Sequence, residues 1–385
     1  ASAMPAFIMR FGHAALCGHF VVLAGLGLYL RLLRAPRLWA LAVPFQVLAL
    51  LIHPYLALMS LALLGAVPLT LLLRGDAGWW RGALGVAAAA AAMGAAMALL
   101  GYLGAEGDGG YGRFALNLLS PIWPHRSLLL GGLVATEVDA TGHGGWEGYN
   151  WLGLGLVVAL AAAVLGAPRA AAEMLRRHAG LALALLGLTL LAVSFRVGLG
   201  GAVLLDLGAA PGFLEQFRAS GRFFWPVGYA LLVGAAVLLA GQGRRGVLVL
   251  CACAVLQWFD ARPMRTALAA WAGERAPWGI EAAALRPLLA AAERITVLPS
   301  WPCIAEEDAA ARVRVLEILL LASESPRPLN TVYAARWRET PRCQDAARAA
   351  EPGELRIALP QAAALLTGSD CVALGDLRVC GGRRP

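Results

Sequence analysis

The chain has 385 residues, of which 59% are hydrophobic and 15% are charged, and this excludes an ordinary soluble protein. Its formal net charge of +8 comes from arginine alone, because the sequence contains no lysine. The arginines form short clusters between apolar runs and make no basic stripe, which argues against a nucleic-acid-binding protein.

Charge divides the chain into two parts. Up to Phe259 there are 16 arginines and 9 acidic residues, whereas from Asp260 onward there are 16 arginines and 15 acidic residues. We therefore expect a transmembrane helical region over 1–259 and a small α/β domain over 260–385. Because the chain begins at Ala1 without a methionine, we expect it to be a piece of a longer protein.

The first part contains apolar runs near the length of about 20 residues that a membrane-spanning helix needs. They predict a polytopic α-helical bundle of about eight spans. The spans are expected at about 12–33, 38–52, 54–73, 82–103, 151–167, 179–196, 223–241 and 246–259. Pro54 disfavours helical geometry at His53, which favours two helices with a tight turn over 38–73, although a single kinked helix is the alternative.

Arginines fall in every second loop between these runs, and this pattern sets the orientation. They are Arg31, Arg34 and Arg37; Arg74 and Arg81; Arg169, Arg176 and Arg177; and Arg244 and Arg245. With these loops inside, the 52–55 turn, the 104–150 loop, the 197–222 segment and the C-terminal domain all face outward. A multi-pass protein of a plasma membrane fits this pattern.

The C-terminal domain reads as alternating elements. Strands are expected at "RITVLPS" and "ELRIALP", helices at "EEDAAARVRVLEILLLASE" and "QAAALL", and a strand leading into a helix at "LNTVYAARW". The segment "CVALGDLRVC" reads as a hairpin with a two-residue Gly375-Asp376 turn.

The cysteines indicate an oxidising compartment for this domain. Counting outward from the turn, Cys371 and Cys380 form a non-hydrogen-bonded pair with the short Cα separation that suits a disulfide. Cys303 and Cys343 are then left to form the second disulfide. Cys17, Cys251 and Cys253 fall within apolar runs and read as small core residues.

The outward loops hold most of the polar residues that could carry chemistry. Glu147, Tyr149 and Asn150 stand at the outer mouth of the fifth run, where membrane anchoring and helix capping are the alternative. His53 and Tyr55 lie at membrane depth and indicate either a wet cavity or a plain turn. His125 and His143 raise a divalent cation as an option, but their spacing matches no tight metal motif, so no metal site and no cofactor is assigned.

The segment "FRASGRFFWP" is the candidate anion site. Ser220 is a good helix N-cap, and Gly221 lets a ligand approach the backbone. With Arg218 and Arg222 on either side, the free amides of a helix start would make a seat for a phosphate. The alternative is that both arginines reach lipid headgroups beside an aromatic belt.

These motifs carry a resemblance. The stretches "RFGHAAL", "IHPYLALM", "NLLSPIWP", "EGYNWLGLG", "FRASGRFFWP" and "LNTVYAARW" resemble an uncharacterised family of bacterial polytopic membrane proteins, itself similar to the GT-C glycosyltransferases. That resemblance implies transfer of a sugar from a polyprenyl-phosphate donor to a glycan or other cell-envelope acceptor. It matches Arg218 and Arg222 to the donor phosphate, and it places the catalytic acid in an N-terminal part outside this sequence.

The leading hypothesis is therefore a GT-C-like transferase in contact with the lipid bilayer and a lipid-linked phosphate sugar. Its outward cavity is expected to be lined by His53, Tyr55, Asn117, Glu147, Tyr149, Asn150, Arg218, Ser220 and Arg222. Two alternatives stay open: a transporter or flippase for a lipid-linked anion, and a non-catalytic membrane protein whose outer domain binds an envelope partner.

Overall fold

The computed structural model describes residues 2–104, 106–107, 109–134, 138–139, 147–334, 336–337, 343, 350–368 and 370–381. The chain forms two compact units. The first comprises Ala1–Leu103 and Asp108–Gly273, and the second comprises Gly104–Gly107 and Glu274–Pro385. The segment 260–273, expected from its charge to begin the C-terminal domain, thus groups with the helical unit.

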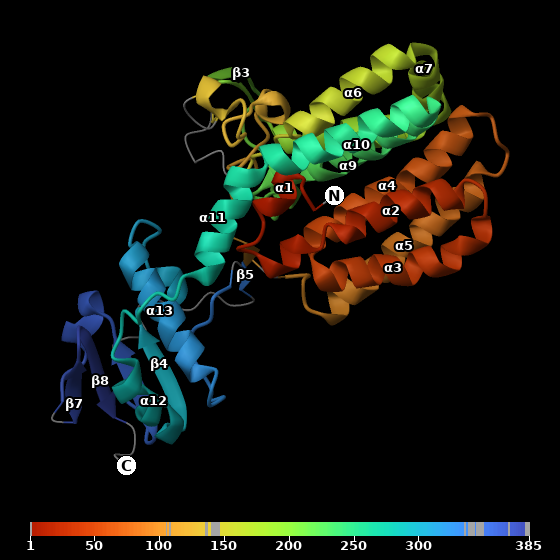
Figure 1. Ribbon diagram of the computed structural model, residues 1–385. Helices are drawn as coiled ribbons and strands as arrows, with labels where there is room; N and C mark the ends of the chain where they lie inside the picture. Colours follow the sequence, from red (N-terminus) through yellow and green to blue (C-terminus); the bar gives the residue numbers. More distant parts are fainter. Residues whose placement is uncertain are drawn as a thin grey trace. The chain divides into compact units, whose positions relative to one another are not determined.

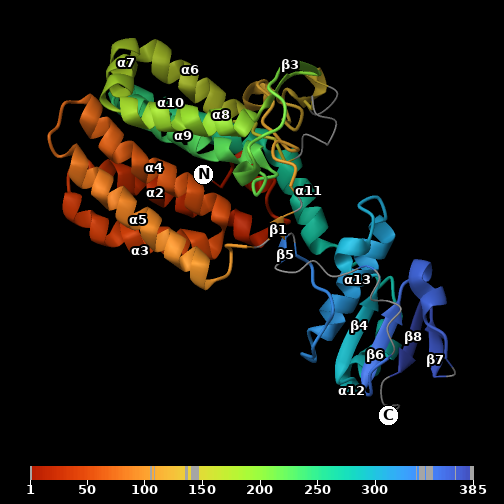
Figure 2. The same cartoon turned by 180° about the vertical axis from the view of Figure 1, so that it is seen from behind.

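The first unit is an assembly of apolar helices, and each of the eight predicted runs coincides with one of them. These are α2 (Phe20–Leu32), α3 (Trp39–Ile52), α4 (Pro54–Leu73), α5 (Trp79–Leu99), α6 (Leu154–Gly166), α8 (Ala179–Val193), α9 (Trp225–Ala240) and α10 (Gly243–Asp260). Figure 1 and Figure 2 show α2 to α5 as one group and α6, α9 and α10 as another, and α4 packs against α8. The break at His53 confirms the expectation of two helices over 38–73.

Not every helix is long enough to cross a membrane. Four helical segments have the length and composition to do so, Ala14–Leu32, Pro54–Leu73, Trp79–Leu99 and Ser220–Ala240, and there are up to six if each of two bent pairs is one span. The helices Pro36–Ile52 and Ala179–Val193 are shorter. The described residues therefore make this a membrane protein with four to six candidate spans.

Two of the connections differ from the sequence expectation. The arginine-bearing segment after α6 is itself a helix, α7 (Pro168–Arg177), bent by 101° from α6. Pro168 starts α7 because a proline at the first helical position lacks only an amide that has no partner there. The segment 197–222, for which no strand or helix was predicted, includes most of a hairpin of β2 (Arg196–Leu199) and β3 (Ala202–Asp206).

Short elements complete the first unit. They are α1 (Pro5–Ile8), η1 (Ala14–Cys17), η2 (Pro36–Leu38), η3 (Ser120–Ile122), η4 (Gly131–Leu133), η5 (Gly212–Leu214), η6 (Ser220–Phe224) and α11 (Arg262–Gly273). A buried core of Val, Leu, Ala and aromatic side chains runs between the helices. His19, at the start of α2, bonds Tyr229 of α9 through Nδ1 and the hydroxyl at 2.9 Å.

The second unit is a small α/β fold. Its sheet has the order β4-β6-β8-β7, formed by β4 (Arg294–Leu298), β6 (Glu354–Ala358), β8 (Leu377–Gly381) and β7 (Cys371–Leu374). The strands β4 and β6 are parallel, and the other pairs are antiparallel. The helices α12 (Ala282–Ala291) and α13 (Ala309–Ala322) contribute buried side chains to the same core as the strands. The short helix η9 (Pro360–Leu365) belongs to a second small cluster.

Both predicted disulfides are present. Cys371 pairs with Cys380 across the hairpin, in the register Leu374 to Leu377 that the two-residue turn dictates, and their Cα atoms are 4.0 Å apart. Cys303 pairs with Cys343. These bonds are compatible with an extracytoplasmic location of the second unit.

The segment "LNTVYAARW" is extended where it is described, so the expected helical half is wrong. Leu329 bridges Ile295, and residues 336–337 form β5 (Arg336–Trp337), which pairs with β1 (Glu106–Gly107). The Asn330 side chain explains the extended course. It accepts from the Val297 amide at 2.8 Å and donates to the Val297 carbonyl at 3.0 Å, and so replaces a neighbouring strand beside β4.

We predict that Gly180 is required for α8 to pack against α4. A Cβ at Gly180 would collide with the backbone of Thr70, so Gly180→Ala should lower the free energy of unfolding by about 1–3 kcal/mol through overpacking. The matched control is Gly187→Ala on the same helix, where nothing lies within 4 Å. Thermal unfolding in detergent checks this, and equal melting temperatures for the two variants would contradict it.

Candidate functional site

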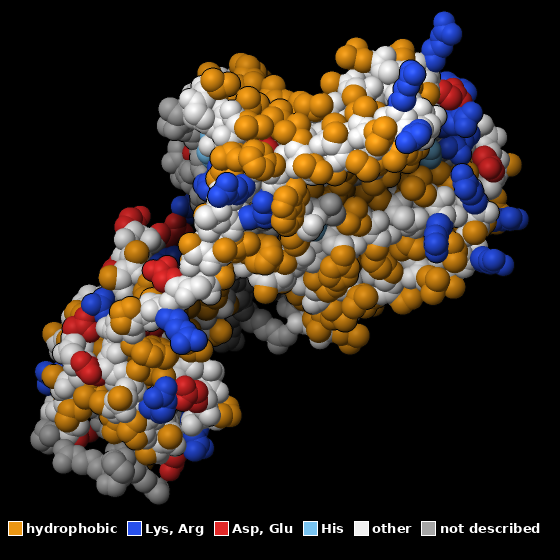
Figure 3. Space-filling model, viewed as in Figure 1, with side chains coloured by type: hydrophobic (Ala, Val, Ile, Leu, Met, Phe, Trp, Pro, Cys, Tyr) orange, Lys and Arg blue, Asp and Glu red, His pale blue; other side chains and the backbone are white. Residues whose placement is uncertain are grey.

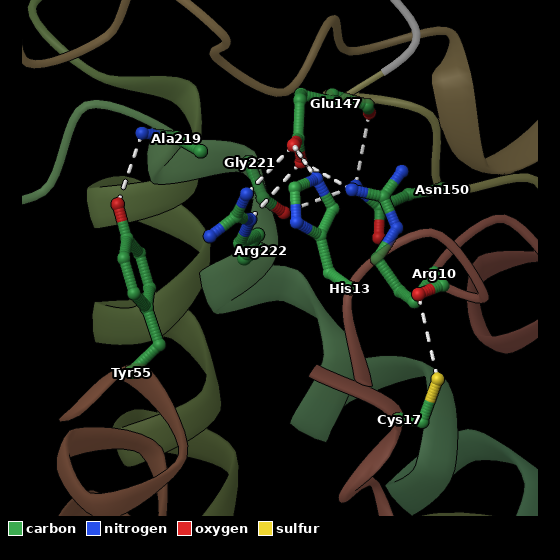
Figure 4. Close-up of polar contacts among 10 residues, drawn as sticks. Arg10, His13, Cys17, Tyr55, Glu147, Asn150, Ala219, Gly221 and Arg222 are labelled. Atoms are coloured by element: carbon green, nitrogen blue, oxygen red, sulfur yellow. Dashed lines mark hydrogen bonds and ion pairs between the residues drawn. The ribbon is translucent and has the colours of Figure 1, made fainter. Parts of the chain in front are cut away.

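Glu147 lies buried between two arginines from distant parts of the chain (Figure 4). Its carboxylate accepts from Arg10 Nη1, and from Arg222 Nε at 3.0 Å and Nη2 at 2.6 Å. The exposed fraction of the side chain is 3% for Glu147, 1% for Arg10 and 11% for Arg222. We call these three residues the triad, and it carries one net positive charge.

The two guanidiniums decide the ionisation of Glu147. Burial alone would raise the pKa of the carboxyl, but the charges of Arg222 and Arg10 and the hydrogen bond from Arg222 outweigh it and hold the pKa below its ordinary value. Glu147 is therefore an anion at neutral pH and a weak proton acceptor.

His13 is the accessible member of this cluster. Its Nε2 lies 3.8 Å from Glu147 Oε1, and its side chain is 40% exposed. Burial lowers the pKa of His13; Glu147 opposes this, and Arg222 and Arg10 add to the lowering. The imidazole is therefore largely neutral at pH 7 and able to accept a proton.

A hydrogen-bonded frame joins the Glu147 loop to the Arg222 segment. Asn150 Nδ2 donates to the carbonyls of Gly148 at 2.9 Å and Gly221 at 3.0 Å. Ser120 Oγ donates to the Gly148 carbonyl and accepts from the Asn150 amide at 2.8 Å. Asn150 is thus a framework residue that holds the Glu147 loop and the Arg222 segment together.

The structure corrects the expected anion seat at Ser220 and Gly221. Ser220 is not the N-cap, because the Ser220 hydroxyl donates to the Ala192 carbonyl and Ala219 occupies the cap position. The Gly221 amide is not free either, since it donates to the Phe114 carbonyl at 3.0 Å. A Cβ at Gly221 would lie 2.9 Å from Gly148 Cα, so this glycine permits close packing of two chain segments, where approach of a ligand was expected.

His53 and Tyr55 serve the helix start and the Arg222 segment. His53 Nδ1 accepts from the Tyr55 amide at 3.2 Å and caps α4. The Tyr55 hydroxyl accepts from the Ala219 amide at 2.9 Å, and the Arg222 guanidinium lies over the Tyr55 ring at 5.0 Å. Of the two interpretations of this segment, a plain turn and a wet cavity, the plain turn fits His53. Tyr55 instead lies against the triad.

The remaining predicted residues lie in different surroundings. Arg218 is half-buried, with its guanidinium 5.7 Å from the centre of the Phe114 ring. Asn117 bonds both backbone groups of Gly200, by donating to the carbonyl at 2.8 Å and accepting from the amide at 3.0 Å. Tyr149 packs edge-on to His125 and has its hydroxyl against Met264. The structure therefore brings together Tyr55, Glu147, Asn150 and Arg222, and leaves Asn117 and Tyr149 in framework contacts.

The option of a divalent cation stays a prediction. Within the described ranges, no three His, Cys, Asp or Glu side chains are close enough to hold a metal ion. His143, the second histidine considered for such a site, lies outside the described residues.

Comparison with protein families assigns most of the chain. Residues 1–262 match the profile described as Domain of unknown function (DUF6311), and residues 284–382 match the DUF6311 C-terminal domain. The chain belongs to the DUF6311 family. Comparison with curated proteins and with solved structures found no match.

Two residues of this DUF6311 site were missed as site residues by the sequence reasoning. Arg10 and His13 both stand in "RFGHAAL", a motif that served only for the resemblance. The sequence does carry one signal for Arg10. It is a positive charge next to a predicted span, on the face where the positive-inside rule does not favour one. Glu147, the partner of Arg10, is 137 positions away in the sequence, so this ion pair follows only from the fold.

We predict that removing the charge of Glu147 destabilises the first unit. Glu147→Gln leaves Arg10 and Arg222 buried without a counter-charge, which should lower the free energy of unfolding by about 3 kcal/mol or more. The control is Asp206→Asn, because Asp206 is half-exposed and faces Arg196 at 3.6 Å. Thermal unfolding in detergent should show a large shift for the first variant and a small one for the second; similar shifts would disprove the triad's structural role.

The same ion pairs predict how stability depends on pH. Since the pKa of Glu147 in the folded chain lies below the ordinary value of 4.5, its stabilisation is fully present above about pH 4.5 and is lost as the pH falls through the lower folded pKa. The difference in melting temperature between wild type and Glu147→Gln should therefore shrink only below about pH 4.5. A difference that stayed constant to lower pH would argue against an ionised Glu147.

Proposed function

We propose that the chain is the membrane part of a GT-C-like glycosyltransferase. It would transfer a sugar from a polyprenyl-phosphate donor to a cell-envelope acceptor on the outer side of a bacterial plasma membrane. The observation that carries the proposal is the positively charged triad with the half-exposed, neutral His13 beside it.

The proposal takes all eight apolar helices as membrane crossings. The arginine clusters at the α2–α3, α4–α5, α6–α8 and α9–α10 connections then face the cytoplasm. Residues 10–13, 147 and 217–222 all belong to the other set of connections. A donor phosphate on the outer side would therefore meet the triad and Arg218, and would not meet the cytoplasmic arginines.

Each residue has a distinct chemical part in this proposal. Arg218, which is half-buried beside the triad segment, would hold the donor phosphate together with the positive potential of the triad. His13 would accept the proton of the acceptor hydroxyl as its oxygen bonds to the sugar C1. The bond between C1 and the phosphate oxygen breaks, and its electron pair leaves with the polyprenyl phosphate. Glu147 favours the protonated imidazole that results.

The choice of His13 as the general base differs from the expectation from the resemblance. There, the base is a carboxylate outside this sequence. Among the residues around Glu147, His13 combines exposure with a neutral side chain. Arg222 changes its role as well, because both of its described contacts with Glu147 engage its guanidinium. It sets the charge of the site, and Arg218 keeps the phosphate role that the resemblance implies.

We predict that His13→Gln separates binding from turnover. In membranes with the full-length protein and a polyprenyl-phosphate-linked hexose, release of free polyprenyl phosphate should fall by about 10²–10⁴-fold while donor binding stays unchanged. The control His125→Gln should keep the rate. Because the pKa of His13 lies below its ordinary 6.5, the wild-type rate should decline only below about pH 6.5.

A second variant tests the phosphate contact. Arg218→Gln should weaken donor binding by about tenfold, whereas Arg196→Gln in the exposed hairpin should not. Movement of intact donor across the membrane without release of polyprenyl phosphate would replace the transferase with a flippase. Unchanged binding and turnover in both the His13 and Arg218 variants would reject the site altogether.

A further inference from the structure

The arginine-rich end of the first unit contains two adjoining cavities. One, which we call the basic mouth, has a volume of about 1050 Å³ and is lined by Arg31, Arg34, Arg37, Arg74, Arg176 and Arg177. The other, which we call the apolar groove, has a volume of about 800 Å³ and lies among α2, α7, α8 and α9. Leu30, Arg34, Arg177 and His178 line both cavities, so the groove continues into the mouth.

The groove is built to hold a hydrocarbon chain. Its walls are mainly aliphatic, with Leu26 from α2, Leu181 and Leu185 from α8, and Leu231 and Leu238 from α9. Gly234 on α9 lets α7 pack closely, because an added Cβ there would lie only 3.2 Å from Met174 Cε, tighter than an ordinary contact. A wholly polar ligand such as a nucleotide or free phosphate would gain nothing from these walls.

The mouth is built to hold an anion. Figure 3 shows blue Arg side chains gathered at the end of the helical unit where α7 lies. Of the described residues that line the mouth, none is Asp or Glu. The guanidiniums of Arg31, Arg34 and Arg37 have no hydrogen bond or ion pair with any described residue, whereas the Arg74 guanidinium already donates to the Arg177 carbonyl.

The helix α7 fixes the depth at which an anion would sit. It turns by 101° from α6 and places Met174 in the groove. Glu173 lines the groove near the mouth, and its carboxylate accepts from Arg176 and Arg177. A short helix of this kind lies in the headgroup plane of a bilayer. The mouth is then at the level of lipid phosphates and the groove at the level of acyl chains.

We propose that this site binds an anionic glycerophospholipid of the surrounding bilayer. The lipid phosphate sits in the basic mouth between Arg34 and Arg177, and one acyl chain lies in the apolar groove. The positive-inside pattern accounts for arginines at this end, but it does not require a cavity that joins them to an apolar groove. The site is separate from the triad, because it is built from the connections that carry the inside arginines.

Native mass spectrometry of the full-length protein tests this site, with phosphatidylglycerol and phosphatidylcholine as probes. We expect phosphatidylglycerol to be retained about tenfold more tightly. Arg34→Gln combined with Arg177→Gln should remove that preference. The matched control is Arg244→Gln with Arg245→Gln, two arginines of the same topological face that line neither cavity, and it should keep the preference.

A second variant leaves every charge in place. Gly234→Leu fills the groove and should lower phosphatidylglycerol binding by about tenfold, while Gly187→Leu on open surface should not. Equal retention of the two lipids, or wild-type binding by Gly234→Leu, would overturn the proposal. Displacement of the lipid by inorganic phosphate alone would also overturn it, because it would reduce the site to a free-anion site.

Discussion

A single buried carboxylate ties three distant segments of the helical unit together. Glu147 is accessible to almost no solvent, and an isolated charge in that position would be strongly unfavourable. Arg10 and Arg222 make it tolerable, and in doing so they join the N-terminal segment, the long loop and the entry to α9. The hydrogen bonds of Asn150, Ser120 and Gly221 depend on the same alignment, because they hold the two segments that carry the opposite charges.

The arginines at the two ends of the helical unit differ in burial and in their partners. At the triad, two arginines share one carboxylate and are nearly inaccessible, so their charge acts through the local potential and on the pKa values of Glu147 and His13. At the other end, Arg31, Arg34 and Arg37 are exposed and lie beside an apolar groove. The first arrangement suits a small, fixed site for chemistry, and the second suits an exchangeable lipid. This contrast is why the same residue type supports two different proposals.

The second unit obtains its stability in another way. Its central strand β6 is buried along its whole length, with helices contributing to the core on one side and η9 to a cluster with Leu298 and Cys380. The Cys371–Cys380 disulfide joins the edge strand β7 to β8, and the Asn330 side chain bonds the other edge strand, β4. The motif "LNTVYAARW" thus has a local structural explanation: Asn330 holds β4, and the Thr331 hydroxyl accepts from the Trp301 amide at 2.8 Å.

Periodicity and spacing determined the elements that depend on neighbours in sequence. The eight apolar helices, the break at His53, the strands β4 and β6 and the Cys371–Cys380 pair all follow from local hydrophobicity, one proline or one turn. The helix α7, the β2–β3 hairpin and the extended "LNTVYAARW" were not foreseen, because short amphipathic or polar segments take their conformation from what they pack against.

The same distinction between local sequence and tertiary contacts applies to the candidate site. The sequence alone predicted that Glu147, Asn150, Tyr55 and Arg222 share one face of the membrane, because arginines in alternate loops indicate orientation. Only the tertiary structure decided that Arg222 neutralises Glu147, that Arg10 and His13 join them, and that Ser220 and Gly221 pack against neighbouring backbone. The physical reason is that ion pairs and close backbone contacts join residues that the chain order keeps far apart, and no local pattern encodes their distance.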